Sequence, residues 1–335
     1  MDRVGGGTYV EKKNNPSDRK AFVVTGPTSG MGRSMALALA TPDATVFLVA
    51  RDRGKLDALV GEIDRAGGRA VAVVADFTDL AAVARAAQDI AARARQDGLR
   101  LVGLLNNAGM QHRRPSKTAE GLDQTYTVNH LAAFALTDAL VPALAPGAAV
   151  VFVGSGTEDP DAAGATAFGF RGARFLSVDD SAHGRWAPGG STVPGLDAYA
   201  TSKLCNILTA RGLAREVPPE RVRFFAFDPG LVPGTGLAHG EVQGFIVFAW
   251  HYILPIMARF KKGWSTPRRA ARVAARLLKD DSGVIPNGAY CDDGGRPQPG
   301  SAAVRDDALA ARVVAETRAF LQTALRRDRA VDLVR

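Results

Sequence analysis

Short apolar runs alternate with amphipathic segments rich in Ala, Leu and Arg along almost the whole chain from Ala21. Some runs, such as Val-Val-Phe-Val at 150–153, are apolar at every position. A strand of that kind is buried on both faces, as in a parallel sheet whose faces are covered by helices. The alternation of strand and helix patterns therefore predicts parallel strands joined by crossover helices.

The expected strands number about seven and the expected helices fill the intervals between them. The strands are predicted at 21–25, 45–50, 70–75, 101–106, 149–154, 223–228 and about 288–291, and the last helix at about 306–325. No internal repeat or low-complexity linker divides the chain. We predict an α/β fold in which one doubly wound, Rossmann-type parallel sheet, with helices on both faces, forms a single domain over residues 20–335.

Charge and cysteine content exclude several classes of protein. The net charge of +8 comes mostly from arginines scattered over helices, without a basic run interleaved with aromatic residues, so nucleic-acid binding is not expected. Cys205 and Cys291 lie far apart and outside any metal-ligand spacing, which indicates neither a disulfide framework nor a metal site and is typical of a reducing cytoplasm.

The N-terminal residues 1–19 are polar and contain several glycines, and they lack the apolar core of an export signal. We expect a disordered arm there and a cytoplasmic protein. No uninterrupted apolar run in the chain reaches the length of about 20 residues that a membrane-spanning helix needs.

A glycine-rich turn joins the first strand to the first helix. Glycines let such a turn close and let backbone N–H groups approach a pyrophosphate at the positive end of the helix. Its position directly after a strand and before a helix favours a dinucleotide site over an ordinary turn. The candidate cofactor residues here are Gly26, Thr28, Ser29, Gly30, Met31, Gly32 and Arg33.

The ends of the second and third strands indicate which dinucleotide is bound. An arginine at the second strand accommodates a 2′-phosphate, whereas an acidic residue binds a ribose hydroxyl. Arg51 therefore favours NADP(H), with Arg33 in reach of the same phosphate, although Asp52 would serve the ribose if the register shifted by one. Asp76, followed by Phe77, either accepts a hydrogen bond from an adenine amino group or caps the next helix.

The fourth strand ends in Asn106-Asn107-Ala108-Gly109. Its small residues let the backbone lie against a flat cofactor, and an asparagine can tie neighbouring strands together. Asn107, Ala108 and Gly109 are therefore candidate cofactor contacts. Asn129 follows inside a helix with apolar flanks, where a buried amide needs hydrogen-bond partners. It either satisfies a local backbone group or holds a water that relays protons to Lys203.

Tyr199 and Lys203 are four residues apart, so they lie on the same side of a helix, one turn from each other. A nearby positive charge favours the tyrosinate and lowers the pKa of the phenol, which would let Tyr199 exchange protons near neutrality. Ser155 follows the apolar run at 151–153, whereas no strand leads directly into Ser177 or Ser181. Ser155 is therefore the better candidate for a catalytic hydroxyl.

These motifs, in this order, resemble the short-chain dehydrogenase/reductase superfamily. The resemblance implies that Tyr199 protonates a substrate carbonyl while NADP(H) delivers hydride, that Ser155 orients that carbonyl, and that Lys203 binds the nicotinamide ribose. Asn129 would complete a proton relay. The resemblance also places the nicotinamide amide beside the turn after the sixth strand, with Pro229, Gly230, Val232 and Thr235 as contacts.

Val-Asn-His-Leu at 128–131 and Asn-Gly-Ala-Tyr-Cys at 287–291 are similar to the branch containing retinol dehydrogenases, WW-domain oxidoreductase and light-dependent protochlorophyllide reductase. We predict an NADPH-dependent reductase of a ketone or aldehyde on a bulky, mostly apolar substrate, working reversibly. A light-dependent C=C reductase is an alternative that three segments favour, at 153–155, 202–206 and 229–237, and Asn106-Asn107-Ala108-Gly109 opposes. A catalytically idle sensor or scaffold is a second alternative.

Two segments are expected to surround the substrate. The long insert 156–198 begins and ends at candidate catalytic positions, so we expect it to shape the substrate mouth; within it, His183 is either a substrate contact or a surface histidine. Residues 236–264 are expected to form a lid. The resemblance favours a lid for their aromatic stretch 244–257, and a peripheral membrane contact or an oligomer contact are alternatives. The resemblance also implies a homo-oligomer through the helices near Asn129 and Tyr199.

Overall fold

The computed structural model describes residues 19–232, 265–280 and 283–332. The expected N-terminal arm lies outside the described residues except for Arg19, and so do the expected lid 236–264, its aromatic stretch 244–257 and Thr235.

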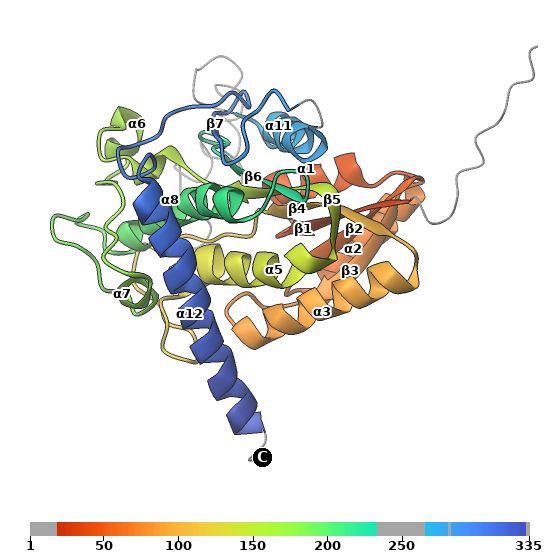
Figure 1. The fold of residues 1–335 in the computed structure, drawn as a ribbon, viewed down its shortest axis with the longest axis horizontal. Coiled ribbons are helices and arrows are strands. Elements are labelled where there is room, and N and C mark those ends of the chain that lie inside the picture. Colours follow the sequence, from red (N-terminus) through yellow and green to blue (C-terminus); the bar gives the residue numbers. More distant parts are fainter. Residues whose placement is uncertain (1–18, 233–264, 281–282, 333–335) are drawn as a thin grey trace, which may run out of the picture.

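Seven parallel strands form one sheet in the order β3-β2-β1-β4-β5-β6-β7, which confirms the predicted fold class (Figure 1). The strands are β1 (Lys20–Thr25), β2 (Ala44–Ala50), β3 (Arg69–Val74), β4 (Arg100–Asn106), β5 (Leu144–Val153), β6 (Val222–Phe227) and β7 (Tyr290–Cys291). The last strand is shorter than predicted. Gly288 has a positive φ of 81° and the Ala289 N–H bonds back to Pro286, so the chain is still turning where we expected it to extend.

Two helical layers cover the sheet because successive strand residues face opposite sides. Ala21 and Val23 pack into one core, whereas Phe22 and Val24 pack into the other. The first core is closed by α3 (Leu80–Gln96), α5 (Ala132–Leu140), α8 (Gly195–Glu216) and α12 (Asp307–Asp332). The second is closed by α1 (Gly30–Leu39), α2 (Arg53–Arg65) and α11 (Pro267–Lys279).

Shorter helical segments lie in the connections. They are α4 (Gln124–Tyr126), the π-helical turn η2 (Thr127–Leu131), η3 (Val141–Ala143), η4 (Gly156–Glu158), α6 (Ala163–Thr166) and α7 (Val178–Ala182). The last three belong to the insert 156–198. Within the described part of the chain, no helix is both long enough and apolar enough to cross a membrane.

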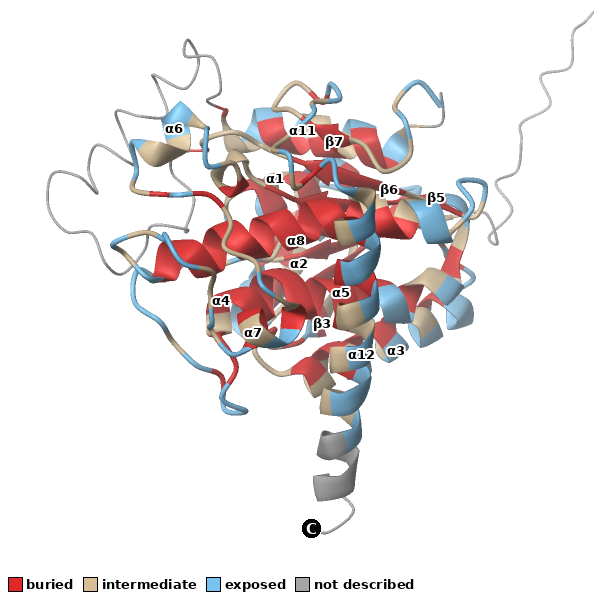
Figure 2. Ribbon diagram, turned by 60° about the vertical axis from the view of Figure 1, so that its left-hand side comes forward, coloured by how far each residue is buried: buried red, intermediate tan, exposed pale blue. Residues whose placement is uncertain are grey.

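Helix α12 is longer than the predicted 306–325 and packs across α8, with further contacts to α5, α7 and α3. Figures 1 and 2 show it crossing this face and projecting beyond the body of the protein. Helix α8 is buried along most of its length, which places Tyr199 and Lys203 inside the molecule.

The strand order reverses between β1 and β4, and a doubly wound sheet binds its ligand at such a switch point, beyond the carboxyl ends of the strands. The segments that follow β1, β4, β5 and β6 begin at Gly26, Asn107, Gly154 and Asp228. All four therefore meet at one edge of the sheet.

Candidate active site

The glycine turn has the geometry that the sequence predicts for a dinucleotide site. Gly26 and Gly30 have positive φ values of 63° and 55°, which residues with a Cβ rarely adopt. A Cβ on Gly32 would collide with the Gly26 carbonyl oxygen. Ser29 precedes α1 in an extended conformation, and its side chain makes no capping hydrogen bond to this helix. The turn therefore presents backbone at a helix N-terminus, where an anion is stabilised.

The second strand leads to two residues with different tasks. The Asp52 carboxylate accepts the Lys55 N–H at 3.0 Å and pairs with the Lys55 Nζ at 3.3 Å, so it caps α2. The same contacts hold the pKa of this exposed carboxyl below its usual range. Arg51 is exposed at the tip of the strand. Asp52 thus has a structural role at the N-terminus of α2, and Arg51 precedes it at the edge where the strands end.

The Arg33 guanidinium, which we expected within reach of the same phosphate, is paired with a carboxylate in this structure. Its Nη2 lies 2.5 and 2.6 Å from the two carboxylate oxygens of Glu62 on α2. Both side chains are partly exposed, so this pair is weak enough to open.

The third strand leads to Asp76, whose carboxylate accepts the Thr78 N–H at 2.9 Å and the Thr78 hydroxyl at 2.8 Å. The cap of α3 is Asp79, which accepts the Ala82 N–H at 2.8 Å. Our alternative that Asp76 caps this helix is thus wrong, because the helix begins three residues after Phe77, at Leu80. The Phe77 side chain packs in the core, so only its backbone is available to a cofactor.

Asn107 ties β4 to β1, as the sequence suggested for an asparagine in this position. Its Nδ2 donates to the carbonyl oxygens of Thr25 at 2.9 Å and Gly26 at 3.2 Å. The Thr25 hydroxyl accepts the N–H groups of Asn107 and Ala108 at 2.9 Å. Gly109 is exposed beyond them, and a Cβ there would lie 3.3 Å from Asn129 Oδ1 and 3.7 Å from Lys203 Nζ.

Asn129 lies on the π-helical turn η2, a distortion that is common at functional sites. Its Oδ1 accepts the Met110 N–H at 2.8 Å, and its Nδ2 donates to the Met110 carbonyl at 3.0 Å and to the Ser202 hydroxyl at 3.0 Å. The sequence left open whether this amide satisfies nearby backbone groups or holds a water. The structure shows it bonded to the backbone of Met110. The backbone carbonyl of Asn129 accepts Asn206 Nδ2 at 3.0 Å.

Ser155, Tyr199 and Lys203 meet at the carboxyl ends of the strands. Ser155 follows β5 and caps η4, and its hydroxyl is near enough to the Tyr199 phenol to lower the pKa of that phenol. Lys203 Nζ lies 5.3 Å from the centroid of the Tyr199 ring and donates to the Val153 carbonyl at 3.0 Å. Both α8 side chains are buried, with exposed fractions of 7% for Tyr199 and 4% for Lys203.

The pKa of Tyr199 differs in direction from the sequence-based prediction. Burial raises the pKa above its usual range, the Asp228 carboxylate raises it further, and the nearby Ser155 hydroxyl opposes this rise only in part. Burial also lowers the pKa of Lys203 to about 8, against an opposing effect of Asp228. Desolvation disfavours the charged form of each group, so it outweighs the effect that we expected Lys203 to have on the phenol.

The turn after β6 places Pro229, Gly230 and Val232 at the same edge, and Gly230 has a positive φ of 69°. It also introduces a residue that sequence reasoning missed. Asp228 Oδ2 accepts the Gly156 N–H at 2.8 Å and Oδ1 accepts the Gly230 N–H at 2.8 Å. The only signal in the sequence is an acidic residue between an apolar strand and Pro-Gly.

The first half of the insert packs against the candidate catalytic helix. The ring of Phe170 lies 5.9 Å from that of Tyr199, and the two join Leu196 and Ala200 in a small apolar cluster. The Arg174 N–H donates to the Thr201 hydroxyl at 2.8 Å. These contacts fit the expectation that the insert borders the substrate.

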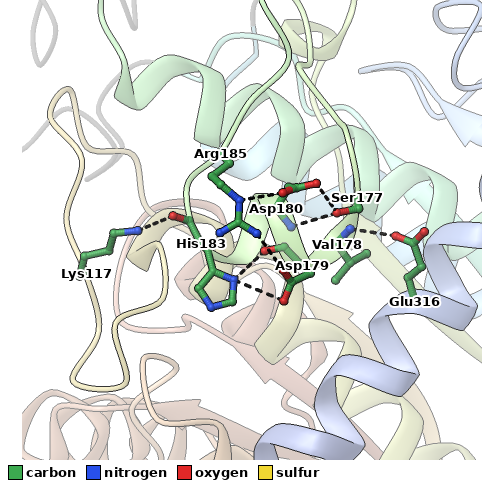
Figure 3. Close-up of polar contacts among 8 residues, drawn as sticks. All are labelled: Lys117, Ser177, Val178, Asp179, Asp180, His183, Arg185 and Glu316. Atoms are coloured by element: carbon green, nitrogen blue, oxygen red, sulfur yellow. Dashed lines mark hydrogen bonds and ion pairs between the residues drawn. The ribbon is translucent and has the colours of Figure 1, made fainter.

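The α7 region forms a separate polar cluster, drawn in Figure 3. His183 is exposed, lies 3.4 Å from an Asp179 carboxylate oxygen and contacts the Phe320 ring. It is therefore a surface histidine, one of the two alternatives that the sequence left open. Ser177 caps α7, and Ser181 is buried in the same helix.

A cavity of about 470 Å³ adjoins this cluster, and none of the candidate catalytic residues lines it.

This chain is similar to known proteins both in sequence and in fold. The family description "short chain dehydrogenase" matches residues 20–169. A daunorubicin C-13 ketoreductase of Streptomyces sp. (strain C5), an assignment that its name marks as provisional, is 30% identical over 88% of this chain and 90% of its own. Human retinol dehydrogenase 12 is 29% identical over 75% and 73%. Protochlorophyllide reductase A of Oryza sativa subsp. japonica is 26% identical over 85% and 75%.

The solved structure is a short-chain dehydrogenase of Burkholderia cenocepacia in complex with NADP, with a TM-score of 0.58 and 26% identity over 84% of this chain and 99% of the other. Together with the parallel sheet and its glycine turn, these likenesses define the class. The chain belongs to the short-chain dehydrogenase/reductase family of oxidoreductases, in the branch that includes retinol dehydrogenases and protochlorophyllide reductase.

Proposed function

We propose that this oxidoreductase reduces a ketone or aldehyde of a bulky, mostly apolar substrate with NADPH, and oxidises the corresponding alcohol in the reverse direction. The observation that carries the proposal is the meeting of the Ser155 hydroxyl, the Tyr199 phenol and the Lys203 ammonium at the carboxyl edge of the sheet. Asn129 adjoins them through Ser202 and Gly109.

The residues around the glycine turn fit a dinucleotide. The contact between Gly32 and Gly26 leaves no room for a side chain, and the Ser29 side chain does not cap the N-terminus of α1. Arg51 stands at the tip of β2, where a 2′-phosphate would lie. Asn107, Ala108, Gly109 and the turn at Pro229 and Gly230 would border the nicotinamide. When bound, NADPH supplies the hydride for the reaction.

The protein's own groups then handle the proton. Hydride addition leaves alkoxide character on the substrate oxygen, so hydrogen-bond donors have to be aimed at that oxygen beforehand. The raised pKa of Tyr199 keeps its phenol protonated at neutral pH, ready to donate. The Ser155 hydroxyl supplies the second donor, and Lys203 provides positive charge beneath the phenol.

An apolar substrate is favoured by the surroundings of Tyr199. Phe170 and Leu196 pack beside its ring, and Val193 and Ala165 extend this cluster. Two relatives bear names that agree with such a substrate, since one is called a daunorubicin C-13 ketoreductase and the other a retinol dehydrogenase.

The test is NADPH consumption with a panel of apolar ketones and aldehydes, in the native protein and in Tyr199→Phe. We expect the variant to lose about 10²- to 10⁴-fold in kcat, because general acid catalysis supplies a factor of this size. Tyr126→Phe is the matched control, since Tyr126 is also buried but its hydroxyl contacts Cys205 Sγ at 3.4 Å. Unchanged turnover in Tyr199→Phe would refute the proposed acid and leave the idle sensor as the better reading.

The choice of NADPH is tested at Arg51. Arg51→Ala should lower kcat/KM for NADPH by about tenfold, the loss of roughly 1.4 kcal/mol expected for a charge-assisted hydrogen bond, and leave NADH use unchanged. Arg53→Ala is the control, because Arg53 pairs with Asp57 along α2 at 2.8 Å. An equal loss with both cofactors would argue against a 2′-phosphate contact.

A light-dependent C=C reductase is kept as the competing activity because of the likeness to protochlorophyllide reductase A. Carbonyl reduction in the dark supports the carbonyl reductase. Turnover that occurs only with a tetrapyrrole substrate under illumination would replace it.

A further inference from the structure

We propose that Asp228 is a positioning residue, which joins the loop carrying Ser155 to the loop after β6 and thereby holds the Ser155 hydroxyl opposite the Tyr199 phenol. The expected effect of Asp228 on turnover rests on the proposed function. The coupling of the two loops does not depend on it, and hydrogen exchange tests that coupling separately.

The contacts of Asp228 run to three separate parts of the chain. One carboxylate oxygen accepts the N–H of Gly156, the residue directly after Ser155, and the other accepts the N–H of Gly230. The Tyr290 hydroxyl on β7 donates to Oδ2 at 3.3 Å. The Asp228 backbone is itself fixed, since its N–H donates to the Cys291 carbonyl at 2.9 Å.

The Gly156 contact leaves little freedom at the start of η4. A Cβ on Gly156 would lie 3.2 Å from Asp228 Oδ2, so the carboxylate sits directly against this backbone. Ser155 is the N-cap of the same turn, with its hydroxyl 3.3 Å from the Thr157 N–H. A shift of the Gly156 amide would therefore rotate or displace the Ser155 side chain.

Of aspartate and asparagine, whose side chains have the same length, only aspartate can accept the N–H groups of both Gly156 and Gly230. Each of its oxygens accepts a hydrogen bond, whereas an asparagine would turn its NH₂ group toward one of the two backbone donors. Asp228→Asn thus preserves the volume of the side chain and removes one of the two loop contacts. The unpaired backbone N–H would favour a displaced loop.

The position of Asp228 also gives the proposal an electrostatic signature. It faces Tyr199 and Lys203 on α8, Glu158 at η4, Tyr290 on β7, and Asp293 beyond it. Its charge raises the pKa of both Tyr199 and Lys203. Neutralising Asp228 should consequently lower the pKa of Lys203 below its value of about 8 in the native protein.

The experiment compares native protein, Asp228→Asn and Asp79→Asn. Asp79 also accepts a backbone N–H, from Ala82 at 2.8 Å, but it caps α3 away from the site. The loop coupling is measured by hydrogen exchange of the Gly156 and Gly230 amides, which requires no turnover. We expect exchange of at least one of the two to be faster by about tenfold or more in Asp228→Asn, in line with the loss of one such contact.

For turnover, kcat of carbonyl reduction should fall about 10- to 100-fold in Asp228→Asn, as expected for a misplaced catalytic group, while KM for NADPH changes little. The alkaline limb of the pH profile should move to lower pH. Asp79→Asn should match native protein in all three measurements.

Faster exchange in Asp228→Asn, combined with no carbonyl reduction by the native protein, would refute the proposed function but keep the loop coupling. Native exchange at both amides, or a lowered kcat with an unmoved pH profile, would overturn the proposal for Asp228.

Discussion

At the scale of single residues, the buried Lys203 sets a pH limit. Burial lowers its pKa to about 8, so the ammonium loses its proton as the pH rises through that value. We expect kcat/KM for carbonyl reduction to fall above pH 8, because the positive charge beneath Tyr199 disappears. Lys203→Arg keeps a charge at all accessible pH values, so it should have lower activity but no descent near pH 8.

The measurement is a pH profile of both proteins from neutral to alkaline pH. Lys55→Arg is the control for a lysine on the surface, since Lys55 is exposed on α2. The same descent near pH 8 in Lys203→Arg would show that another group titrates there and would contradict the assignment.

Sequence reasoning found the site residues whose positions depend on local pattern. Tyr199 and Lys203 are one helical turn apart, and Ser155 directly follows a strand, so both facts are visible in the sequence. The direction of the Tyr199 pKa was not visible, because it depends on burial by parts of the chain such as Phe170. Asp228 was missed for the same reason, since its partner Gly156 is 72 residues away.

At the scale of elements, the close packing of α8 and α12 depends on Gly212. A Cβ there would lie 2.6 Å from Val314 Cγ2 and 2.9 Å from the Ala310 carbonyl oxygen. Gly212→Ala should therefore lower the free energy of unfolding by about 1–3 kcal/mol, the usual cost of overpacking. Gly61→Ala is the matched control, because the added Cβ on α2 would meet no described atom within 4 Å apart from the adjoining backbone of its own helix.

Urea denaturation distinguishes the two variants. Gly61→Ala should be neutral or more stable by up to about 1 kcal/mol, since alanine is the better helix former. Equal stability of Gly212→Ala and native protein would show that the two helices separate at no cost, and would contradict this packing.

The elements were predictable to different degrees. Six strands begin and end close to their predicted bounds because each is a continuous apolar run between turn residues, except that β5 starts earlier than expected, at Leu144. The seventh is only Tyr290–Cys291, because its length is limited by a turn at Gly288 rather than by its own composition. The pairing of Arg33 with Glu62 was equally hidden, because it joins α1 to α2.

At the scale of the whole molecule, α12 covers the surface through which the family resemblance implies association. Arg318 on α12 lies 3.2 Å from an Asp138 oxygen on α5 and 3.0 Å from a Glu216 oxygen on α8. Beneath it, His130 Nε2 lies 3.0 Å from the Thr317 hydroxyl, and both side chains are fully buried. A second copy that packed where α12 lies on α5 and α8 would have to displace this helix.

We therefore expect the native chain to sediment as a monomer of 35.2 kDa at micromolar concentration. Val313→Asp is the informative variant, because Val313 is fully buried on α12 and an unpaired carboxylate there would weaken the docking of the helix. If α12 is what prevents association, this variant should self-associate or aggregate in sedimentation velocity, because apolar residues of α8 such as Leu208 become exposed. Arg326→Asp, an exposed change on the same helix, should stay monomeric. A stable native dimer would contradict the prediction, since it would require either a different interface or a displaced α12.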